Sequence, residues 1–593
     1  MATLDPDLEL LLQYEPQQRL VQLMLDWSGS DEDLTKKGIT LLAPIEDGTA
    51  LVEMSLGTVG RLLDDPDIGY LQLLPNFIPE LDVSRKVVNT PNEVVTGTDG
   101  KQSFKGLTGK GVIIGLIDAD IDVFHQSLRN PDGSSRFLTL WDMNPRGKTA
   151  PIDGLGAPDG FQKGLVYSKA DIDFALSKPI SGETKQQAKR REKLSGNLRM
   201  LRGSGHGTRV ASIAAGNGRL STGAYSKTIG IAPEADLIGV VKRSPHDWAM
   251  AMRFLRKLMQ GKPAVMNLSA GEHHGPHLPD GQVERWFKSF IDSSGISLVK
   301  SAGNGGGLGG HATGLIKKNT AVSLQLTMTA AVAKRASRIR VQIWYGYGGS
   351  DPRLGATITP PNGSTYDVPY DGLCTAPASL IMASNRKRPD QLGLGAVVLW
   401  LKPIAGTWTI RLSAPKTADV KWHAWITWGA LLRRGVSFGP AGLVSDATTI
   451  TVPVAVPNMV TVASFVTKDR KGNAITDYKI AGSSAQGPAA DAVTPALTLA
   501  APGEFVVAAI PPDPKKKEPP PGTTDRYDLG AGTSFAAPHV TGAIALMLEK
   551  NPTLTPAQIV TILRTDPNKS LDDNVWGAGR LDVDKALKLV TAP

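Results

Sequence analysis

The sequence predicts an α/β protein of several domains: a small open-faced unit, then a doubly wound parallel sheet into which an antiparallel β-sandwich is inserted. Three observations lead to this prediction. Residues 19–75 alternate between strand-like and helix-like stretches in the order βαββαβ. Near-continuous apolar runs, typical of buried parallel strands, recur within residues 109–312 and 446–593. Between them, residues 313–445 hold short alternating stretches separated by Gly, Pro and Asn turns.

Length and composition agree with this organisation. The 593 residues exceed one ordinary core, so two to four domains are expected. We place the boundaries at 1–80 for the first unit, 81–108 for a polar linker, 109–312 with 446–593 for the α/β domain, and 313–445 for the sandwich. The single cysteine, Cys374, excludes an internal disulfide framework and a thiolate metal cluster.

Charge and the N-terminus bear on partners and location. The formal net charge is +9, and much of it lies between Lys178 and Arg202 and in Lys515–Lys517. Such runs are mostly solvated loops, and no aromatic interleaving accompanies them, so we expect no nucleic-acid partner. No apolar run reaches the roughly 18 residues of a membrane span, so no membrane partner is expected. The N-terminus lacks the pattern of a signal peptide, which favours a cytoplasmic location.

The elements follow from periodicity. Residues 1–17 are acidic and leucine-rich, which favours a short helix. In the first unit, strands are predicted at 19–27, 38–45, 49–54 and 69–74, and helices at 30–37 and 56–63. In the insertion, strands are predicted at 322–326, 338–345, 356–359, 397–401, 407–412 and 420–427. The α/β pattern resumes near residue 450 and ends in a helix at 583–589.

Residues with catalytic chemistry follow the buried strands of the α/β domain. The apolar run 111–117 ends at Asp118, and working residues gather at the carboxyl ends of parallel strands. His206 begins a small-residue helix between two glycines, which leave its ring sterically open. The strand at 296–301 runs into Ala302, Gly303 and Asn304. Each of these residues, taken alone, is as often structural as functional.

Ser534 stands before a long run of small and apolar residues that suits a helix. Pro538 is tolerated only in or near the first turn, so the helix begins close to the serine. A helix N-terminus offers free N–H groups and a dipole that favour negative charge. This place suits a nucleophile whose attack creates an oxyanion, although a lone serine here is usually an N-cap.

Four motifs occur in an order that resembles the subtilisin-like serine proteases, or subtilases. They are Asp118 after its strand, Gly-His-Gly-Thr at 205–208, Ser-Ala-Gly-Asn at 301–304 and Gly-Thr-Ser-Phe-Ala-Ala-Pro at 532–538. The chain order Asp, His, Ser is that of the family. The unit at 19–75 resembles a subtilase propeptide. The segment 137–142 and the inserted sandwich, expected to be jelly-roll-like, resemble the bacterial Csp-like branch.

The resemblance implies a subtilisin-like fold and a serine endopeptidase acting on polypeptides. Ser534 is the expected nucleophile, His206 its base and Asp118 the residue that orients the imidazole. The Asn304 amide and the Ser534 N–H are the expected oxyanion donors. The N-terminal domain is expected in the groove as inhibitor and folding aid, with residues 79–85 lying there like a product. The peptide is expected between two segments, Ser269, Ala270 and Gly271 on one side and Ser301, Ala302 and Gly303 on the other.

Two positions depart from the family pattern. The family has Asp-(Ser/Thr)-Gly at the first motif, whereas this chain has Asp118-Ala119-Asp120. A second carboxylate beside the first raises its pKa or disturbs the turn. This favours the alternative of a weak or inactive peptide-binding pseudoprotease; a serine esterase suits the extended pairing strands less well. Ala270 replaces a family leucine, which widens one subsite.

No cofactor or metal site is predicted. The run 273–277 holds three histidines, but Gly275–Pro276 breaks any helix that would align them for zinc. Structural calcium is common in the family, yet no dense Asp/Glu loop marks a site. Residues 305–307 beside the specificity pocket carry no acid, so we expect no strong preference for cleavage after Arg or Lys.

Overall fold

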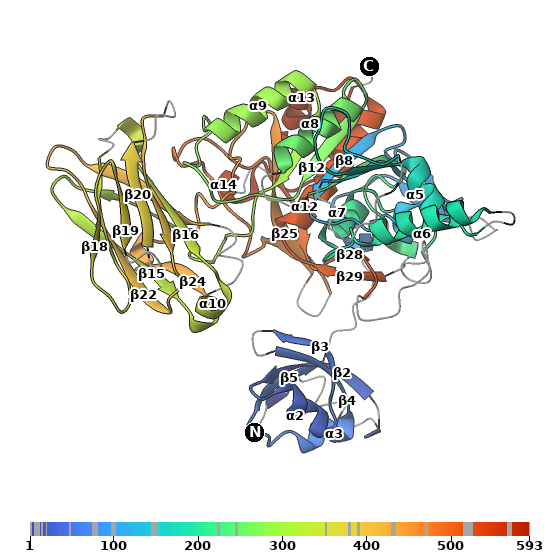
Figure 1. Ribbon diagram of the computed structural model, residues 1–593. Coiled ribbons are helices and arrows are strands. Elements are labelled where there is room, and N and C mark those ends of the chain that lie inside the picture. The colour runs from blue at the N-terminus through green and yellow to red at the C-terminus, as the bar shows by residue number, and fades with distance from the viewer. Residues whose placement is uncertain are drawn as a thin grey trace. The chain divides into compact units, whose positions relative to one another are not determined.

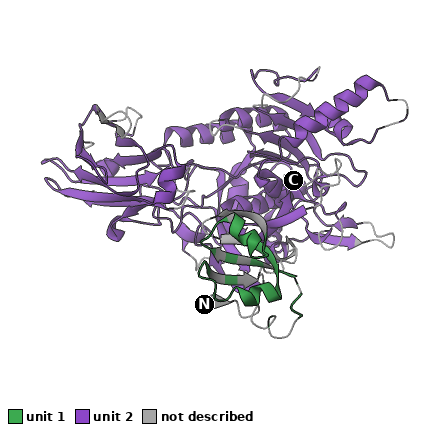
Figure 2. Ribbon diagram, turned by 60° about the horizontal axis from the view of Figure 1, so that its bottom comes forward, with its two compact units in different colours: residues 1–78, 470–473 green, residues 79–469, 474–593 purple. Residues whose placement is uncertain are grey.

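The computed structural model divides the chain into two compact units (Figure 2). Unit 1 comprises residues 1–78 and 470–473, and unit 2 comprises residues 79–469 and 474–593. The structure describes residues 3–4, 12, 16–18, 20–46, 49–73, 81–96, 102–143, 152, 154–179, 181, 183–221, 226–242, 247–349, 353–376, 381–387, 392–427, 435–468, 473–513, 526–565 and 572–591.

Unit 1 has the βαββαβ order expected from its periodicity, with one further short strand. Its sheet runs in the order β1-β5-β2-β4-β3, in which β1 is parallel to β5 and the other pairs are antiparallel. Leu23 and Val52 of the sheet form one core with Leu34 and Val59 of the helices. The helix expected in 1–17 lies mostly outside the described residues. The elements are β1 (Thr3–Leu4), β2 (Leu20–Trp27), α2 (Asp31–Lys36), β3 (Thr40–Glu46), β4 (Thr49–Ser55), α3 (Leu56–Arg61) and β5 (Ile68–Leu73).

The core of unit 2 is a mainly parallel sheet, as its apolar runs predict. Its strands follow the order β10-β9-β11-β8-β12-β13-β25-β26, and β27 also pairs with β25. The pairs are parallel except β10 with β9 and β26 with β25. The strands are β8 (Ile113–Asp118), β9 (Phe137–Asp142), β10 (Leu165–Ser168), β11 (Asp236–Val241), β12 (Ala264–Leu268), β13 (Ser297–Ser301), β25 (Met459–Lys468), β26 (Ala474–Ile480) and β27 (Leu499–Glu504).

Helices cover both faces of this sheet, so it is doubly wound (Figure 1). Along β8 the side chains alternate between two cores. Ile114 and Leu116 pack with helices α7 and α12, whereas Ile113 and Ile117 pack with helices α8 and α9. Burial on both faces explains why the strand sequence is continuously apolar. The helices are α7 (His206–Ala215), α12 (Thr533–Lys550), α8 (Trp248–Met259) and α9 (Gln282–Ser294).

The segment 81–108, expected to be a linker, instead carries regular structure within unit 2. It forms helix α4 (Leu81–Val87) and a hairpin of β6 (Glu93–Thr96) with β7 (Gln102–Lys105). Ser84 and Arg85 are buried, and the Ser84 hydroxyl lies 2.9 Å from Nε2 of His539 in α12. The expectation that residues 79–85 lie in the groove like a product is therefore wrong for residues 81–85, because this part is a helix held against the core.

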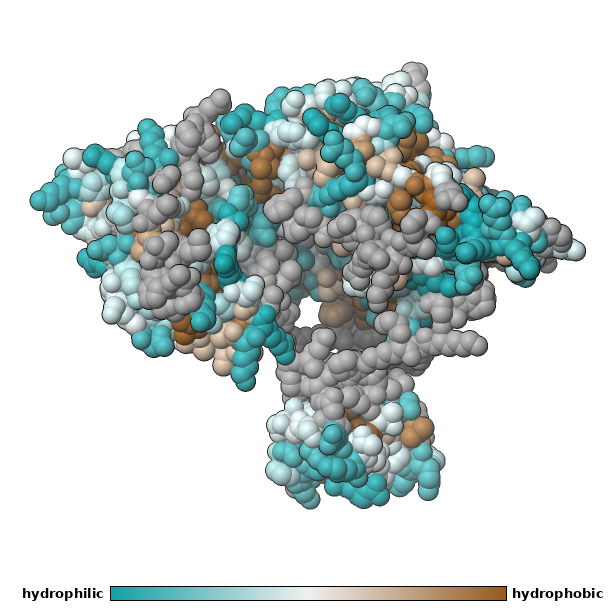
Figure 3. All heavy atoms as spheres, viewed as in Figure 1, coloured by the Kyte–Doolittle hydropathy of each residue, from teal (hydrophilic) through white to brown (hydrophobic). Residues whose placement is uncertain are grey.

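The peripheral elements of unit 2 include the basic stretch seen in the sequence. Helix α6 is strongly hydrophilic on its exposed side (Figure 3). Arg190 pairs with Asp171 at 2.9 Å, and Arg191 pairs with Glu183, so neighbouring carboxylates partly neutralise the charge. Among the described residues, no helix combines the length and apolarity that a membrane crossing needs. These elements are α5 (Lys169–Leu176), α6 (Lys185–Arg199), β28 (Val506–Ile510), β29 (Arg526–Gly530), α13 (Pro556–Arg564), α14 (Asp573–Trp576) and α15 (Val583–Leu589).

Two antiparallel sheets form an insertion between β13 and β25. One sheet follows the order β14-β23-β16-β21-β20-β19 and the other β18-β17-β22-β15-β24. Ile343 and Leu399 of the first sheet and Ile410 of the second belong to one shared core. The elements are β14 (His311–Ile316), β15 (Ala321–Met328), α10 (Ala330–Arg335), β16 (Ile339–Tyr345), β17 (Gly355–Thr359), β18 (Tyr366–Val368), β19 (Gly372–Ala376), β20 (Ile381–Lys387), β21 (Gly395–Leu401), β22 (Gly406–Ser413), β23 (Val420–Ile426) and β24 (Val436–Gly439).

Candidate active site

The carboxylate of Asp118 and the imidazole of His206 meet at the carboxyl edge of the parallel sheet. Asp118 ends β8, and His206 begins α7. His206 Nδ1 lies 2.9 Å from each carboxylate oxygen of Asp118, and the Ala119 N–H donates to Asp118 Oδ1 at 2.7 Å. Asp118 is buried, whereas the His206 side chain is 33% exposed. A buried charge therefore orients a ring that is open to a reactant.

The electrostatic environment favours the protonated form of His206. Burial alone lowers the pKa of His206, but the charge of Asp118 and its hydrogen bond, with a further contribution from the charge of Asp120, raise it above the ordinary 6.5. With Nδ1 bound to a carboxylate, the neutral ring carries its proton there and leaves Nε2 as the base.

Asp120 holds the loop that leads into α7. Its Oδ2 accepts hydrogen bonds from the Ser204 N–H at 2.9 Å, the Ser204 hydroxyl at 2.8 Å and the Gly205 N–H at 3.2 Å. Its Oδ1 accepts from the Gly207 N–H at 2.9 Å. Gly203 provides the room, because a Cβ there would lie 2.6 Å from the Asp120 Cβ.

Asp120 therefore holds this loop in place, whereas the sequence predicts that a second carboxylate disturbs the turn. Gly205, the N-cap of α7, has no side chain to accept the first N–H groups of the helix. The Asp120 carboxylate accepts from one of them, the Gly207 N–H, and a negative charge is favourable at this end of a helix. Burial, followed by the charge of Asp118, raises the pKa of Asp120.

Ser534 is the second residue of α12, as the apolar run after it predicts. Gly532 before it adopts φ 130°, a conformation that favours glycine. Ser534 Oγ lies 3.5 Å from the Ser269 carbonyl oxygen, which is its hydrogen-bond acceptor among the described residues, and the Ser269 hydroxyl donates to the Ser534 carbonyl at 2.9 Å. The ring of Phe535, the residue after Ser534, lies 5.5 Å from that of His206, centroid to centroid, so the first turns of α12 and α7 lie side by side.

Asn304 follows β13, and Thr533 holds its side chain in one orientation. Asn304 Oδ1 accepts from the Thr533 N–H at 2.8 Å and from the Thr533 hydroxyl at 2.9 Å. A backbone N–H can only donate, so this atom is the amide oxygen, and Nδ2 is the side-chain donor. A Cβ at Gly532 would lie 2.9 Å from this nitrogen. Asn304 therefore presents an N–H donor beside the turn that carries Ser534.

The two segments expected to hold a peptide differ in their backbone hydrogen bonds. Ala270 and Gly271 are half-buried, and within the described chain their N–H and C=O groups have no ladder partner. In the other segment, the Ala302 N–H donates to Val462 at 2.9 Å, and the Gly303 carbonyl accepts from Ala485 at 2.9 Å. Only the first segment therefore has a free backbone edge, while Ser301, Ala302 and Gly303 are buried as a wall.

The loop 272–277 continues the first segment and packs against the sandwich. The Gly275 N–H donates to Gln342 Oε1 at 2.8 Å, and the Tyr347 hydroxyl donates to the Pro276 carbonyl at 2.8 Å. His277 stacks on Trp425, with ring centroids 4.1 Å apart and planes at 6°. The sandwich thus fixes the loop that extends from the free edge.

Buried histidines gather around Trp425. His273 and His277 of the loop stack 5.3 Å apart, as do His311 and His423 of the sandwich. Burial lowers the pKa of His273 to about 3 and of His311 to about 4, and it lowers those of His277 and His423 well below 6.5. The rings are therefore neutral at neutral pH. In the part of the chain that is described, no three His, Cys, Asp or Glu side chains are placed to hold a metal ion.

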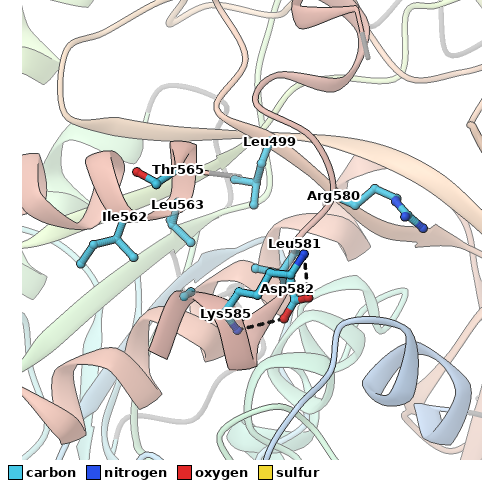
Figure 4. A pocket seen from close by; sticks show the side chains of 9 residues that line it. Leu499, Ile562, Leu563, Thr565, Arg580, Leu581, Asp582 and Lys585 are labelled. Carbon is cyan, nitrogen blue, oxygen red and sulfur yellow. Dashed lines mark hydrogen bonds and ion pairs between the residues drawn. The ribbon is translucent and has the colours of Figure 1, made fainter. Parts of the chain in front are cut away.

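A separate small pocket lies near the C-terminal helices α13 and α15 (Figure 4). Its volume of about 20 Å³ has room for one water molecule. None of the predicted site residues lines it, so it has no role in the chemistry of the candidate active site. Its lining residues are Leu499, Ile562, Leu563, Thr565, Arg580, Leu581, Asp582, Lys585 and Ala586.

Sequence reasoning identifies the chemical groups and misses the residues that hold them. Thr533 lies within the serine motif without a predicted role, and Asp120 stands out only as a departure from the family pattern. Thr451, whose side chain lies against Gly271 and Gly303 of the two peptide-binding segments, gives no local signal because the fold alone brings it there. His311 and His423 likewise become neighbours of the loop histidines only in three dimensions.

Comparisons with known proteins identify the family of the chain. The subtilase family model matches residues 109–342 and 441–579. Over 433 residues the chain is 26% identical to the subtilisin-like protease SBT1.6 of Arabidopsis thaliana, covering 65% of this chain and 53% of the relative. Over 171 residues it is 28% identical to the serine protease AprX of Bacillus subtilis, covering 27% of this chain and 36% of the relative. The chain thus spans about half the length or less of these two relatives.

A solved structure shares the fold. The CspB protease of Clostridium perfringens superposes with a TM-score of 0.64 and 20% identity, over 86% of this chain and 97% of that chain. At this identity the likeness shows the fold alone. It agrees with the subtilisin-like fold and the Csp-like resemblance that the sequence motifs predict.

Proposed function

The chain belongs to the subtilase family, and on this premise we propose that it is a serine endopeptidase whose nucleophile is Ser534. The observation that carries the proposal is the Asp118–His206 pair, hydrogen-bonded at 2.9 Å beside the helix N-terminus that bears Ser534. An oriented base next to a serine is the arrangement that activates a hydroxyl for nucleophilic attack. The catalytic triad would be Asp118, His206 and Ser534.

The first step forms an acyl-enzyme. His206 Nε2 takes the proton of the Ser534 hydroxyl as Oγ attacks the carbonyl carbon, and Asp118 stabilises the imidazolium. In the free protein the hydroxyl contacts the Ser269 carbonyl, so it must rotate toward His206 when a peptide arrives. Catalytic hydrogen bonds are often long before substrate binds, and this geometry is compatible with the step.

The tetrahedral intermediate carries a negative oxygen that needs donors. Asn304 Nδ2 supplies one, because Thr533 already holds the amide oxygen. The Ser534 N–H, in the first turn of α12, supplies the other. His206 then gives its proton to the leaving amine, the bond between carbonyl carbon and nitrogen breaks, and a water repeats the cycle to release the acid.

The substrate would be an extended polypeptide. Ala270 and Gly271 offer the free backbone edge on which a peptide adds as a strand. The segment Ser301–Gly303 would bound the other side without pairing, since its backbone groups already have partners. This division refines the expectation that both segments pair with the peptide.

Unit 1 would serve as an inhibitory and folding domain. The support is its separate core and its βαββαβ order, which matches the propeptide resemblance. If the chain matures by self-cleavage, the cut would fall before residue 81, because α4 belongs to unit 2 and is buried against α12. Intact-mass measurement of wild type and Ser534→Ala should then show loss of about 80 residues in the wild type alone.

Covalent labelling separates this proposal from a peptide-binding pseudoprotease. A fluorophosphonate probe should label wild type at Ser534 and fail to label Ser534→Ala or His206→Ala. Thermal unfolding of the variants controls for loss of fold. A folded wild type that neither labels nor cleaves any peptide would contradict the enzyme and favour the pseudoprotease.

A further inference from the structure

Thr451 fills the space between the two segments that bound the proposed substrate. A Cβ added at Gly271 would overlap Thr451 Oγ1 and lie 2.6 Å from Thr451 Cβ, and one added at Gly303 would lie 2.7 Å from Thr451 Cγ2. These separations are too short for real carbon contacts. The threonine side chain therefore rests directly on the backbone of both glycines.

Hydrogen bonds fix this side chain and its backbone in place. The Thr451 N–H donates to the Ala302 carbonyl at 2.9 Å, and the Val452 N–H donates to the Glu272 carbonyl at 2.9 Å. Residues 451–452 are thus hydrogen-bonded to the second segment and to the loop that continues the first. Thr451 Oγ1 accepts from Lys300 Nζ at 3.0 Å and lies 3.1 Å from the Ala302 carbonyl, to which it donates.

The position of Thr451 leaves little depth for a ligand. Thr451 is 1% exposed, and Lys300 beneath it is 0% exposed. His273 closes the neighbouring part, since its Nε2 would lie 3.2 Å from a Cβ at Gly305. A rotation of the threonine would break its hydrogen bond with the buried Lys300 side chain, and leaving a buried polar group without that partner has a free-energy cost.

We propose that Thr451 is a specificity-determining residue that restricts the position preceding the scissile bond to glycine, alanine or serine. This inference rests on the proposed function. A peptide with its reactive carbonyl between Ser534 and Asn304 must direct the preceding side chain between the two segments, where Thr451 stands. Alanine fits above the threonine, whereas leucine or phenylalanine needs the volume that the threonine fills.

The restriction also bears on charged side chains. Arg and Lys side chains, like phenylalanine, need the volume that Thr451 fills, and Lys300 Nζ lies behind that volume, 3.0 Å from Thr451 Oγ1. This gives a second physical reason to expect no strong preference for cleavage after Arg or Lys, beside the missing acid in residues 305–307.

The test uses peptidyl phosphonate esters that differ only in the side chain next to the reactive phosphorus: alanine, leucine or phenylalanine. The full chain is labelled with each, and a small fluorophosphonate reports Ser534 reactivity independently. In wild type we expect alanine to react about 100-fold faster than phenylalanine. Thr451→Gly should shrink this ratio at least about tenfold. The matched control Thr451→Ser keeps the hydroxyl for Lys300 and should preserve the preference for alanine over phenylalanine.

The outcomes distinguish the role of Thr451 from the proposed endopeptidase function. Equal labelling of wild type by alanine and phenylalanine probes, with normal fluorophosphonate labelling, would overturn the role of Thr451 and leave the enzyme standing. An unchanged ratio in a Thr451→Gly variant that keeps its melting temperature would do the same. If Thr451→Gly fails to fold, Thr451→Ala provides the larger space with less backbone freedom. No labelling by any probe would contradict the proposed function and this inference together.

Discussion

Asp120→Asn tests the role of the second carboxylate most directly, because the side chain keeps its shape and loses its charge. Oδ2 of Asp120 receives three hydrogen bonds, so the amide oxygen should take that position. The amide NH2 is then left against the Gly207 N–H, which donates to Oδ1 in the wild type. Losing one charge-assisted hydrogen bond costs roughly 1.5–3 kcal/mol. Burial of the charge, which raises the pKa of Asp120, offsets part of this. We expect the free energy of unfolding to fall by about 2 kcal/mol.

The same substitution should shift the pH dependence of activity. The charge of Asp120 contributes to the raised pKa of His206, so this pKa falls when the charge is removed. His206 acts as a base only when neutral, and the acid limb of kcat/KM should therefore move to lower pH. On the plateau, kcat should fall about tenfold, because the loop before α7 holds the ring less firmly.

The assay is the pH profile of kcat/KM on one peptide, with thermal unfolding followed in parallel. Ser204→Ala is the matched control, since it removes a hydroxyl hydrogen bond to Oδ2 and keeps the charge. It should lose about 1 kcal/mol of stability and leave the acid limb in place. An acid limb that does not move in Asp120→Asn would refute the electrostatic reasoning. An Asp120→Gly variant more active than wild type would show that the carboxylate harms the site.

Asn304→Leu removes the side-chain oxyanion donor and should lower kcat about 10²–10³-fold with KM little changed; a loss confined to KM would contradict a transition-state role. Thr533→Val removes the hydroxyl that orients this amide, and we expect kcat to fall about tenfold, measured on the same peptide. The buried histidines predict acid sensitivity: because burial lowers their pKa below 6.5, their contribution to stability is complete above pH 6.5 and is lost as pH falls toward about 4 for His311. Each costs about 1.4 kcal/mol per pH unit in that window, so His277→Phe should flatten the decline of melting temperature between pH 6.5 and 5; an unchanged slope would argue against the cluster.

Elements with a clear hydrophobic period can be predicted from the sequence. A continuous apolar run marks the strand that ends at Asp118, and a run of small residues marks the helix that begins at His206. Strands β18, β19 and β20 of the sandwich escape prediction, because short or polar strands carry little period. The segment 81–108 has the composition of a linker because its anchors, Ser84 and Arg85, are polar residues whose burial depends on distant partners.

The candidate site divides in the same way. Asp118, His206, Asn304 and Ser534 stand in local motifs, so the resemblance to the subtilases is enough to expect their roles. The groups that orient them act across the fold. Asp120 reaches a loop more than 80 residues away in the sequence. Local motifs in the sequence mark the reactive residues. The residues that orient them can be identified only from the tertiary structure.

The sandwich enters the chain after Asn304 and leaves it before Thr451, and its two ends meet, since the Gly307 N–H donates to Asp446 Oδ1 at 2.9 Å. Replacing the sandwich with a short turn between these ends should therefore leave the sheet domain intact. The same replacement would disturb the proposed substrate site, because the loop 272–277 contacts Gln342, Tyr347 and Trp425 of the sandwich. Across relatives that carry the insertion, substitutions in this loop should be matched by substitutions at those three positions. Lineages without the sandwich should have replaced the loop outright.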